Sequence, residues 1–228
     1  MDLKDIRPKS TERMLLVGAT GTGKTTLARR LIQSSIAENP KHPVIIIDPK
    51  CTYDPEDDRF KLIHSPFDLR WQGRKQFIHY RPSPDYQDVK SYDSIYKWVF
   101  ARKEILVYTD ETYMTMRGQR SPQWQTACVT CGRELGIGML FATQRPSGID
   151  LRIYTESEHK VSFYLAYDKD RDRMAEEMGE IVKVDPVMAA QKLDKTGTPH
   201  PHAFWRWNSR DRVTRLAELN LGGTKSGV

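Results

Sequence analysis

A glycine-rich segment near the start of the chain has the composition of a phosphate-binding loop. Residues 18–25 read GATGTGKT and match the pattern G-x-x-x-x-G-K-[ST]. An apolar run precedes the segment and a helical pattern follows it. In that setting, backbone N–H groups and a helix N-terminus converge on phosphate oxygens. An ordinary glycine-rich turn is the alternative, and the strand and helix signals on both flanks disfavour it.

The residues of this loop have separate expected roles toward a nucleotide. Lys24 is expected to neutralise the β- and γ-phosphates of ATP, and Thr25 to supply a hydroxyl group to Mg²⁺. The expected nucleotide-binding residues are the whole loop and the residue after it: Gly18, Ala19, Thr20, Gly21, Thr22, Gly23, Lys24, Thr25 and Thr26.

Two acidic residues follow another apolar run, ILVYT at 105–109. Asp110 is expected to hold Mg²⁺ together with Thr25, and Glu111 to accept a proton from an attacking water. Machines that hydrolyse nucleoside triphosphates commonly have this second carboxylate, whereas many small-molecule kinases lack it. Solvated turn residues are the alternative, but ligands of α/β sheets bind at the carboxyl ends of the strands. Asp48, which ends VIIID, either organises the magnesium waters or the nucleophile, or caps the next turn.

A fourth apolar run, GMLFAT at 138–143, is followed directly by Gln144 and Arg145. An amide both donates and accepts hydrogen bonds. Gln144 is therefore expected to sense the γ-phosphate or a polarised water and to pass that state to the following loop, RPSGIDLR. The alternative is an amide that only holds this loop in place.

The elements that must position these residues alternate between strands and helices. All-apolar runs of this kind fit a parallel sheet that is covered on both faces. The order predicts an α/β fold with a doubly wound, mostly parallel central sheet and helices on both faces. One domain is expected over residues 1–207 and a flexible C-terminal tail over 208–228. The predicted strands are 14–18, 44–48, 76–82, 105–109, 138–143 and 160–167, and the predicted helices are 24–37, 89–103, 121–136 and parts of 170–194.

The composition excludes several classes of protein. The 228 residues carry a formal net charge of +6, which permits a polyanionic partner without requiring one. No apolar run approaches the ~20 residues of a membrane span. The N-terminus lacks the apolar region of a secretory signal, and three cysteines do not form a disulfide framework, so a cytoplasmic setting is expected. Cys128 and Cys131 lack a second pair for zinc and are expected to be structural.

Four motifs taken together resemble a known family. GATGTGKTT, VIIIDPK, ILVYTDE and FATQRPSGID, in this order and at this spacing, resemble the FtsK–HerA superfamily of DNA-pumping ATPases over roughly residues 12–180. The run ATQRPS is especially similar to the FtsK pattern. The resemblance implies a RecA-like P-loop NTPase core, a ring that is often a hexamer, and ATP-driven threading of double-stranded DNA through a central pore.

The length of the chain favours one branch of this superfamily. FtsK-type pumps carry membrane spans and a winged-helix DNA reader, and HerA proteins carry an N-terminal barrel, whereas the first predicted strand here begins at residue 14. The chain therefore most resembles the genome-packaging ATPases of membrane-containing icosahedral viruses. That resemblance implies capsid or capsid–membrane vertex proteins as partners, and a place in the host cytoplasm or the virion. The alternatives are a HerA-like DNA-repair translocase, a phage-morphogenesis or protein-assembly ATPase, and a P-loop kinase of small molecules.

Membership of a ring implies that a basic residue of the neighbouring subunit completes each site. Arg133, which precedes the strand at 138–143, is the favoured candidate. Lys160 and Arg145 are the alternatives, because this chain has His159-Lys160 where family members often have an arginine.

A ring pore also needs phosphate contacts that ignore DNA sequence. The segment TMRGQR at 115–120 is expected to line the pore, with Arg117 and Arg120 on DNA phosphates, and an ordinary surface loop is the alternative. The segment FWRW at 204–207 is expected to be a terminal strand on the core rather than a platform for stacked bases.

Overall fold

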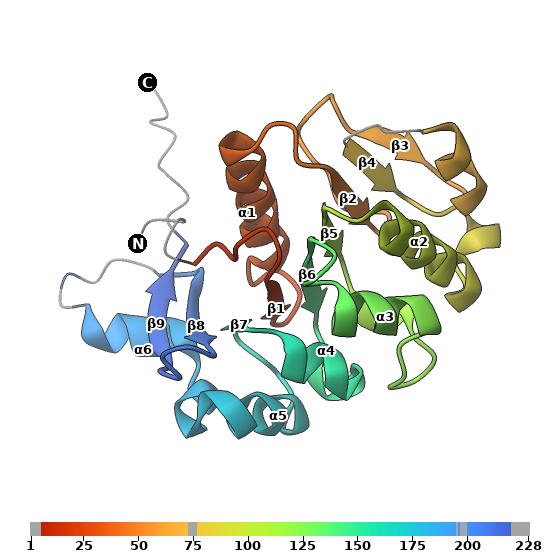
Figure 1. Cartoon of the computed structure of the whole chain (residues 1–228). Coiled ribbons are helices and arrows are strands. Elements are labelled where there is room, and N and C mark those ends of the chain that lie inside the picture. Colours follow the sequence, from red (N-terminus) through yellow and green to blue (C-terminus); the bar gives the residue numbers. More distant parts are fainter. Residues whose placement is uncertain (1–5, 73–76, 195, 197–199, 220–228) are drawn as a thin grey trace.

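Nine strands form one sheet in the order β3-β4-β2-β5-β6-β1-β7-β8-β9 (Figure 1). The structure, a computed structural model, describes residues 6–72, 77–194, 196 and 200–219. The strands are β1 (Arg13–Val17), β2 (Val44–Ile47), β3 (Lys61–Ile63), β4 (Phe77–Tyr80), β5 (Ile105–Thr109), β6 (Ile137–Thr143), β7 (His159–Ser162), β8 (Ala203–Asn208) and β9 (Arg215–Glu218).

The first seven strands in sequence run parallel, and β8 and β9 are antiparallel additions at one edge. The central strands are buried at every position, which is why their sequences are mostly apolar rather than alternating. Parallel pairing brings the carboxyl ends of β2, β5, β6 and β1 to the same edge of the sheet. That edge carries the predicted phosphate loop, acidic pair and Gln144.

Helices cover both faces of the sheet (Figure 1). Helix α1 packs on one face through Leu27, Leu31 and Ile36, and α2 to α5 pack on the other. The helices are α1 (Lys24–Glu38), α2 (Val89–Arg102), α3 (Gln123–Cys131), α4 (Leu151–Glu156), α5 (Asp168–Met178) and α6 (Pro186–Leu193). Short 3₁₀ turns connect them: η2 (Pro66–Trp71), η3 (Pro84–Tyr86), η4 (Thr112–Thr115), η5 (Pro146–Gly148) and η6 (Glu180–Lys183).

The predicted fold class is confirmed, and the structure corrects several elements. The loop predicted after Gln144 contains α4, which begins where the Asp150 side chain accepts a hydrogen bond of 2.9 Å from the backbone N–H of Arg152. Strand β3 was not predicted because its three residues carry no periodic signal. The predicted helix at 121–136 ends at Cys131.

The prediction of a flexible tail over 208–228 is wrong in part. Residues Arg215–Glu218 form β9, which pairs antiparallel with β8. The edge of β8 supplies the partner for this short strand, and a sequence alone does not show that edge. Residues 220–228 lie outside the described part of the chain. The predicted terminal strand FWRW is confirmed as part of β8, with Trp205 and Trp207 buried, so stacking of bases on these two rings is excluded.

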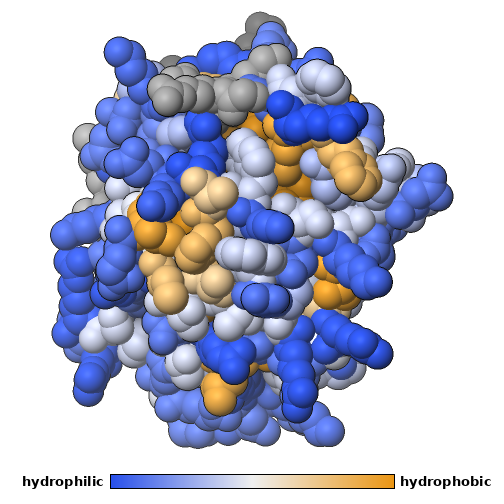
Figure 2. Space-filling view, turned by 45° about the vertical axis from the view of Figure 1, so that its right-hand side comes forward, coloured by the Kyte–Doolittle hydropathy of each residue, from blue (hydrophilic) through white to orange (hydrophobic). Residues whose placement is uncertain are grey.

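The surface is mainly hydrophilic, with small apolar patches between polar residues on the face seen in Figure 2. In the described part of the chain, no helix combines the length and the hydropathy that crossing a bilayer requires.

Candidate functional site

The phosphate loop joins the end of β1 to the start of α1, as predicted. Its backbone is held on both sides, because Gly18 N–H donates to the carbonyl of Thr143 (3.3 Å) and Ala19 N–H donates to the carbonyl of Tyr164 (2.8 Å). A Cβ atom at Gly18 would lie 2.7 Å from the Cβ of Phe163, so this position has room only for glycine. Gly23 has a φ of 108° at the start of α1, a conformation that L side chains rarely adopt.

Lys24 is turned into the loop that it belongs to. Its ammonium group donates to the carbonyls of Gly18 (2.6 Å) and Ala19 (2.9 Å). Burial lowers the pKa of Lys24 to about 8, and the carboxylates of Glu111 and Asp110 oppose that shift. These carbonyl contacts hold the positive charge of Lys24 inside the loop. When a nucleotide binds, its phosphates would compete with the carbonyls for the ammonium group.

Asp110 is a buried carboxylate directly after β5. Its Oδ1 accepts a hydrogen bond of 2.9 Å from the hydroxyl of Tyr108. Burial raises the pKa of Asp110, and the nearby carboxylates of Asp48 and Glu111 raise it further. A carboxylate destabilised in this way gains from a nearby cation, and Mg²⁺ prefers one or two protein oxygens together with phosphate oxygens and waters. The carboxylate of Asp110 fits that requirement, and Thr25 follows Lys24 at the start of α1.

Glu111 is also buried, with 2% of its side chain exposed. Its backbone has a φ of 52°, a left-handed conformation that is uncommon for residues other than glycine and recurs at functional sites. This backbone directs the side chain toward β6. Oε1 accepts a hydrogen bond of 2.8 Å from the backbone N–H of Gln144, and Oε2 accepts one of 2.9 Å from the Gln144 amide.

Gln144 connects the acidic pair to the phosphate loop. While its Nε2 donates to Glu111, its Oε1 accepts a hydrogen bond of 3.1 Å from the hydroxyl of Thr20. The structure thus brings Lys24, Glu111 and Gln144 together at one edge of the sheet. The predicted position of Gln144 beside the phosphate loop follows from the parallel pairing of β6 with β1.

Asp48 and Lys50, two charged residues that follow β2, have different roles. Asp48 caps the next turn, because its carboxylate accepts hydrogen bonds from the backbone N–H groups of Thr52 (3.2 Å) and Tyr53 (3.0 Å). Lys50, two residues later, forms an ion pair of 2.6 Å with Glu111. The sequence analysis missed Lys50 as a site residue. A basic residue just beyond a second buried strand was the available signal.

Arg133 lies at the opposite edge of the sheet from its own phosphate loop. It sits between α3 and the start of β6, is 55% exposed and forms an ion pair with Glu158. It therefore cannot reach the site of its own chain, and its predicted role in a neighbouring site remains a prediction. Arg145 is 52% exposed, pairs with Asp170 (3.4 Å) and stacks over the ring of Tyr167 (4.3 Å).

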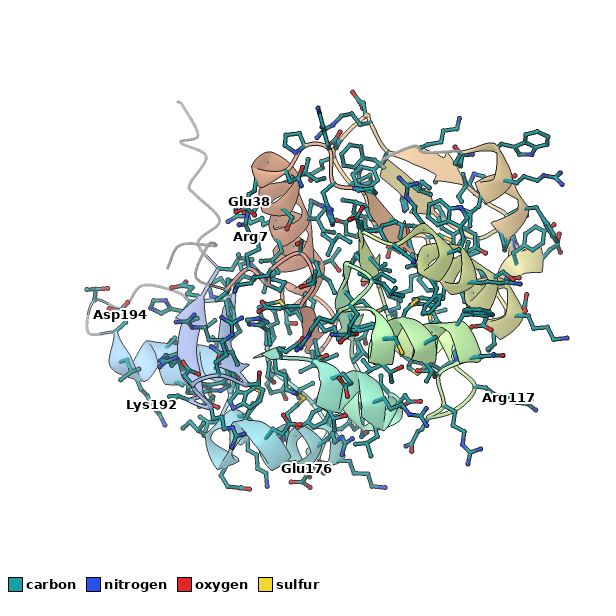
Figure 3. The ribbon with its side chains drawn as sticks, in the orientation of Figure 1. Arg7, Glu38, Arg117, Glu176, Lys192 and Asp194 are labelled. Atoms are coloured by element: carbon teal, nitrogen blue, oxygen red, sulfur yellow. The ribbon has the colours of Figure 1, made fainter. Side chains whose placement is uncertain are left out.

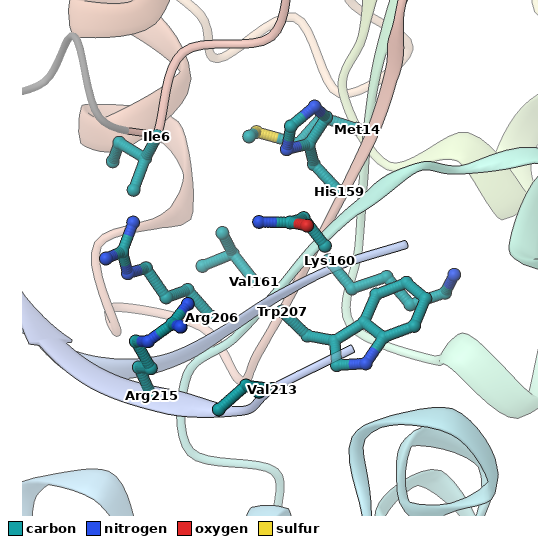
Figure 4. A pocket seen from close by; sticks show the side chains of 10 residues that line it. Ile6, Met14, His159, Lys160, Val161, Arg206, Trp207, Val213 and Arg215 are labelled. Carbon is teal, nitrogen blue, oxygen red and sulfur yellow. The ribbon is translucent and has the colours of Figure 1, made fainter. Parts of the chain in front are cut away.

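Lys160 is excluded as a residue that completes a neighbour's site. Its side chain has no exposed surface, and its ammonium group donates to the carbonyl of Ser157 (2.8 Å) and to Glu177 (2.8 Å). The ammonium also lies over the ring of Trp207 (4.6 Å), along which the side chain extends in Figure 4. These contacts make Lys160 a core residue between β7 and α5.

Arg117 and Arg120 lie on an exposed turn between η4 and α3, where their backbones form an isolated antiparallel bridge. Arg117 extends away from the body of the molecule (Figure 3). Between the two arginines, Gln119 donates a hydrogen bond of 2.9 Å to the carbonyl of Ser147, in the loop after Gln144. The candidate DNA loop is thus joined to the candidate sensor loop.

Cys128 and Cys131 are free thiols. Cys128 is buried, in agreement with the predicted structural role, whereas Cys131 is exposed, so a structural role for it is not supported. In the described residues, no group of three or more His, Cys, Asp and Glu side chains is arranged to hold a metal ion by itself.

Two solved structures with a similar fold contain nucleotide analogues. The genome packaging NTPase B204 of Sulfolobus turreted icosahedral virus 2, in complex with AMPPCP, aligns with a TM-score of 0.71 and 16% identity, covering 94% of this chain and 100% of that chain. The conjugation coupling protein TcpA of pCW3, with ATPγS, aligns with a TM-score of 0.53 and 14% identity, covering 90% of this chain and 59% of that chain. A comparison with curated proteins gave no match.

A family model identifies the chain directly. The model described as the central domain of helicase HerA (DUF87) matches residues 5–126, a stretch that runs from before β1 into α3. It includes the phosphate loop, Lys50, Asp110 and Glu111. The chain therefore belongs to the HerA central-domain family, within the FtsK–HerA superfamily of ATPases.

Proposed function

We propose that the protein is a magnesium-dependent ATPase that moves double-stranded DNA, and that it is the genome-packaging motor of a virus. The observation that carries the ATPase proposal is the convergence at one sheet edge of Lys24, Asp110, Glu111 and Gln144, with Thr25 beside Lys24 at the start of α1. Each residue type matches one requirement of phosphoryl transfer to water: phosphate charge, metal coordination, a proton acceptor and a sensor.

The chemistry assigns one role to each side chain. Lys24 holds the β- and γ-phosphates, and Thr25 with Asp110 would hold Mg²⁺, which neutralises charge on the phosphates when bound. The water oxygen bonds to the γ-phosphorus while the bond from that phosphorus to the bridging oxygen breaks. The electron pair stays on ADP, and Glu111 takes the proton of the water. Gln144 holds Glu111 and, through Thr20, the phosphate loop.

The coupling of this site to DNA rests on a chain of contacts. Gln144 is followed by the loop that carries Ser147, and Ser147 contacts Gln119 between the two exposed arginines. A shift of Gln144 when the γ-phosphate is lost would therefore move the loop that holds Arg117 and Arg120. Contacts from these arginines to phosphates would grip DNA without reading its sequence.

The role in packaging is supported by the extent of the similarity to B204. The alignment covers 100% of that packaging NTPase. On this proposal the protein works as a ring, which we expect to be a hexamer, with Arg133 reaching the neighbouring site. Its partners would be double-stranded DNA and the capsid or capsid–membrane vertex proteins, and it would act in the host cytoplasm and on the virion.

The direct test of the DNA motor is displacement of a triplex-forming oligonucleotide from a linear duplex. We expect displacement that requires ATP and Mg²⁺ and stops with AMPPCP. The matched variant Arg117→Ala with Arg120→Ala should retain basal ATP turnover and lose displacement. ATP turnover without any displacement, by an assembled ring, would contradict the proposal and favour an ATPase that acts on protein.

A further inference from the structure

Lys50 caps the buried carboxylate of Glu111 on the side that faces solvent. Its ammonium nitrogen is 2.6 Å from Glu111 Oε2, and 31% of the Lys50 side chain is exposed, against 2% for Glu111. The residues follow β2 and β5, which are neighbouring strands of the sheet. Together with Gln144 and Thr20, they form a hydrogen-bonded series that follows the strand order β2-β5-β6-β1 (Figure 1).

Both carboxylate oxygens of Glu111 already accept hydrogen bonds. Oε1 accepts from the backbone N–H of Gln144 (2.8 Å) and from the hydroxyl of Thr143 (3.4 Å). Glu111 Oε2 accepts hydrogen bonds from both Lys50 (2.6 Å) and the Gln144 amide (2.9 Å). A carboxylate oxygen offers two lone pairs, so both are filled. Water can give a proton to this oxygen only after one of the two donors has moved away.

Lys50 is the donor better placed to move. The Gln144 amide is fixed at both ends, by Glu111 and by Thr20. In the part of the chain that the structure describes, the Lys50 ammonium has Glu111 as its only hydrogen-bond partner. Lys50 and Lys24 follow β2 and β1, whose carboxyl ends lie at the same edge of the sheet, so both side chains are available to phosphates bound there.

We propose that Lys50 is a second phosphate-binding lysine, held by Glu111 in the empty site and transferred to the γ-phosphate oxygens when ATP binds. This inference rests on the proposed ATPase function and deepens it. The transfer frees Glu111 Oε2 to accept the proton of the attacking water. It also brings a cation of the same chain to the γ-phosphate oxygens, where negative charge develops during the reaction. This cation would act in addition to any residue that a neighbouring subunit contributes.

The first test compares turnover in Lys50→Met, Lys50→Arg and the matched control Lys61→Met. Methionine keeps the side-chain stem and removes the charge, and Lys61 is an exposed lysine on β3. With Mg²⁺ and double-stranded DNA, we expect Lys50→Met to reduce ATP turnover roughly 100-fold. Lys50→Arg should retain more turnover than Lys50→Met, and Lys61→Met should match the wild type. Turnover of Lys50→Met at or above the wild-type rate would overturn the proposal, since Lys50 would then only restrain Glu111.

The second test measures binding without turnover, in a Glu111→Gln background. Adding Lys50→Met should weaken ATP binding by about tenfold and leave ADP binding unchanged, because only ATP carries the γ-phosphate. Equal losses for ATP and ADP, or no loss for either, would overturn the proposal. If the wild-type protein does not hydrolyse ATP, the proposed function fails, while this binding comparison still decides the role of Lys50.

Discussion

The hydroxyl of Thr20 in the phosphate loop donates a hydrogen bond of 3.1 Å to Oε1 of Gln144 at the end of β6. The same amide donates to Glu111 from its nitrogen (2.9 Å). One side chain therefore contacts both the loop that would hold the phosphates and the carboxylate that would activate water. A change at the γ-phosphate reaches Glu111 through a single intermediate.

Replacing this amide tests its proposed role. Gln144→Ala should lower ATP turnover by roughly ten- to a hundredfold, because Glu111 loses a side-chain hydrogen bond that orients it. ATP affinity, measured by titration calorimetry, should change much less. Gln33→Ala, on the exposed side of α1, is the matched control. Equal turnover in Gln144→Ala and the control would show that the amide only supports its loop.

The contact between Gln119 and Ser147 predicts how DNA binding affects ATP turnover. Gln119→Ala should leave turnover without DNA unchanged and reduce its stimulation by double-stranded DNA, because the exposed turn loses its 2.9 Å bond to the loop after Gln144. The exposed Gln123, at the start of α3, provides a control substitution. Undiminished stimulation in Gln119→Ala would mean that the signal travels by another route.

Lys160 should contribute to stability rather than to a neighbour's catalysis. Lys160→Ala is expected to reduce the free energy of unfolding by roughly 2–4 kcal/mol, because it removes a buried cation that pairs with Glu177 and packs on Trp207. Lys160→Met, which retains most of the packing, should cost less. Urea unfolding of the variants measures both values. Unaltered stability with lost turnover would reinstate Lys160 as a residue that completes a neighbouring site.

The contacts of His200 near β9 predict that the stability of the fold depends on pH. Hydrogen bonds to Glu218 and Asp194 raise the pKa of His200 above its ordinary value of 6.5. A raised pKa in the folded state stabilises the fold below that ordinary value, and the contribution is lost as the pH rises through the folded pKa. The melting temperature of His200→Gln should therefore fall below that of the wild type at pH 6, with the difference shrinking toward pH 9. A difference independent of pH would contradict this assignment.

Much of the site could be predicted because it depends on strand ends. Glu111 and Gln144 each follow a fully apolar strand, and such strands run parallel and end at one edge. Local sequence thus indicated both the residues and their convergence. Asp48 illustrates the limit of that logic, because its strand end is at the same edge and yet its carboxylate caps a turn.

The remaining features depend on which segments become neighbours. Lys50 meets Glu111 because β2 lies beside β5, an order that no local pattern specifies. Lys160 is buried because β8 pairs with β7 and brings Trp207 over it. Strand β9 exists because β8 offers it an edge. Long-range pairing determined these features, so residue type and spacing alone could not predict them.

The central claim is that this site hydrolyses ATP in response to DNA. The most direct measurement is ATP turnover by the assembled protein, with and without double-stranded DNA, beside Glu111→Gln. Ring formation is checked first by light scattering, because a single subunit would lack the contribution of its neighbour. We predict turnover that rises with DNA and falls at least about 100-fold in Glu111→Gln, with ATP binding retained. Turnover that ignores DNA, or that survives in Glu111→Gln, would contradict the account.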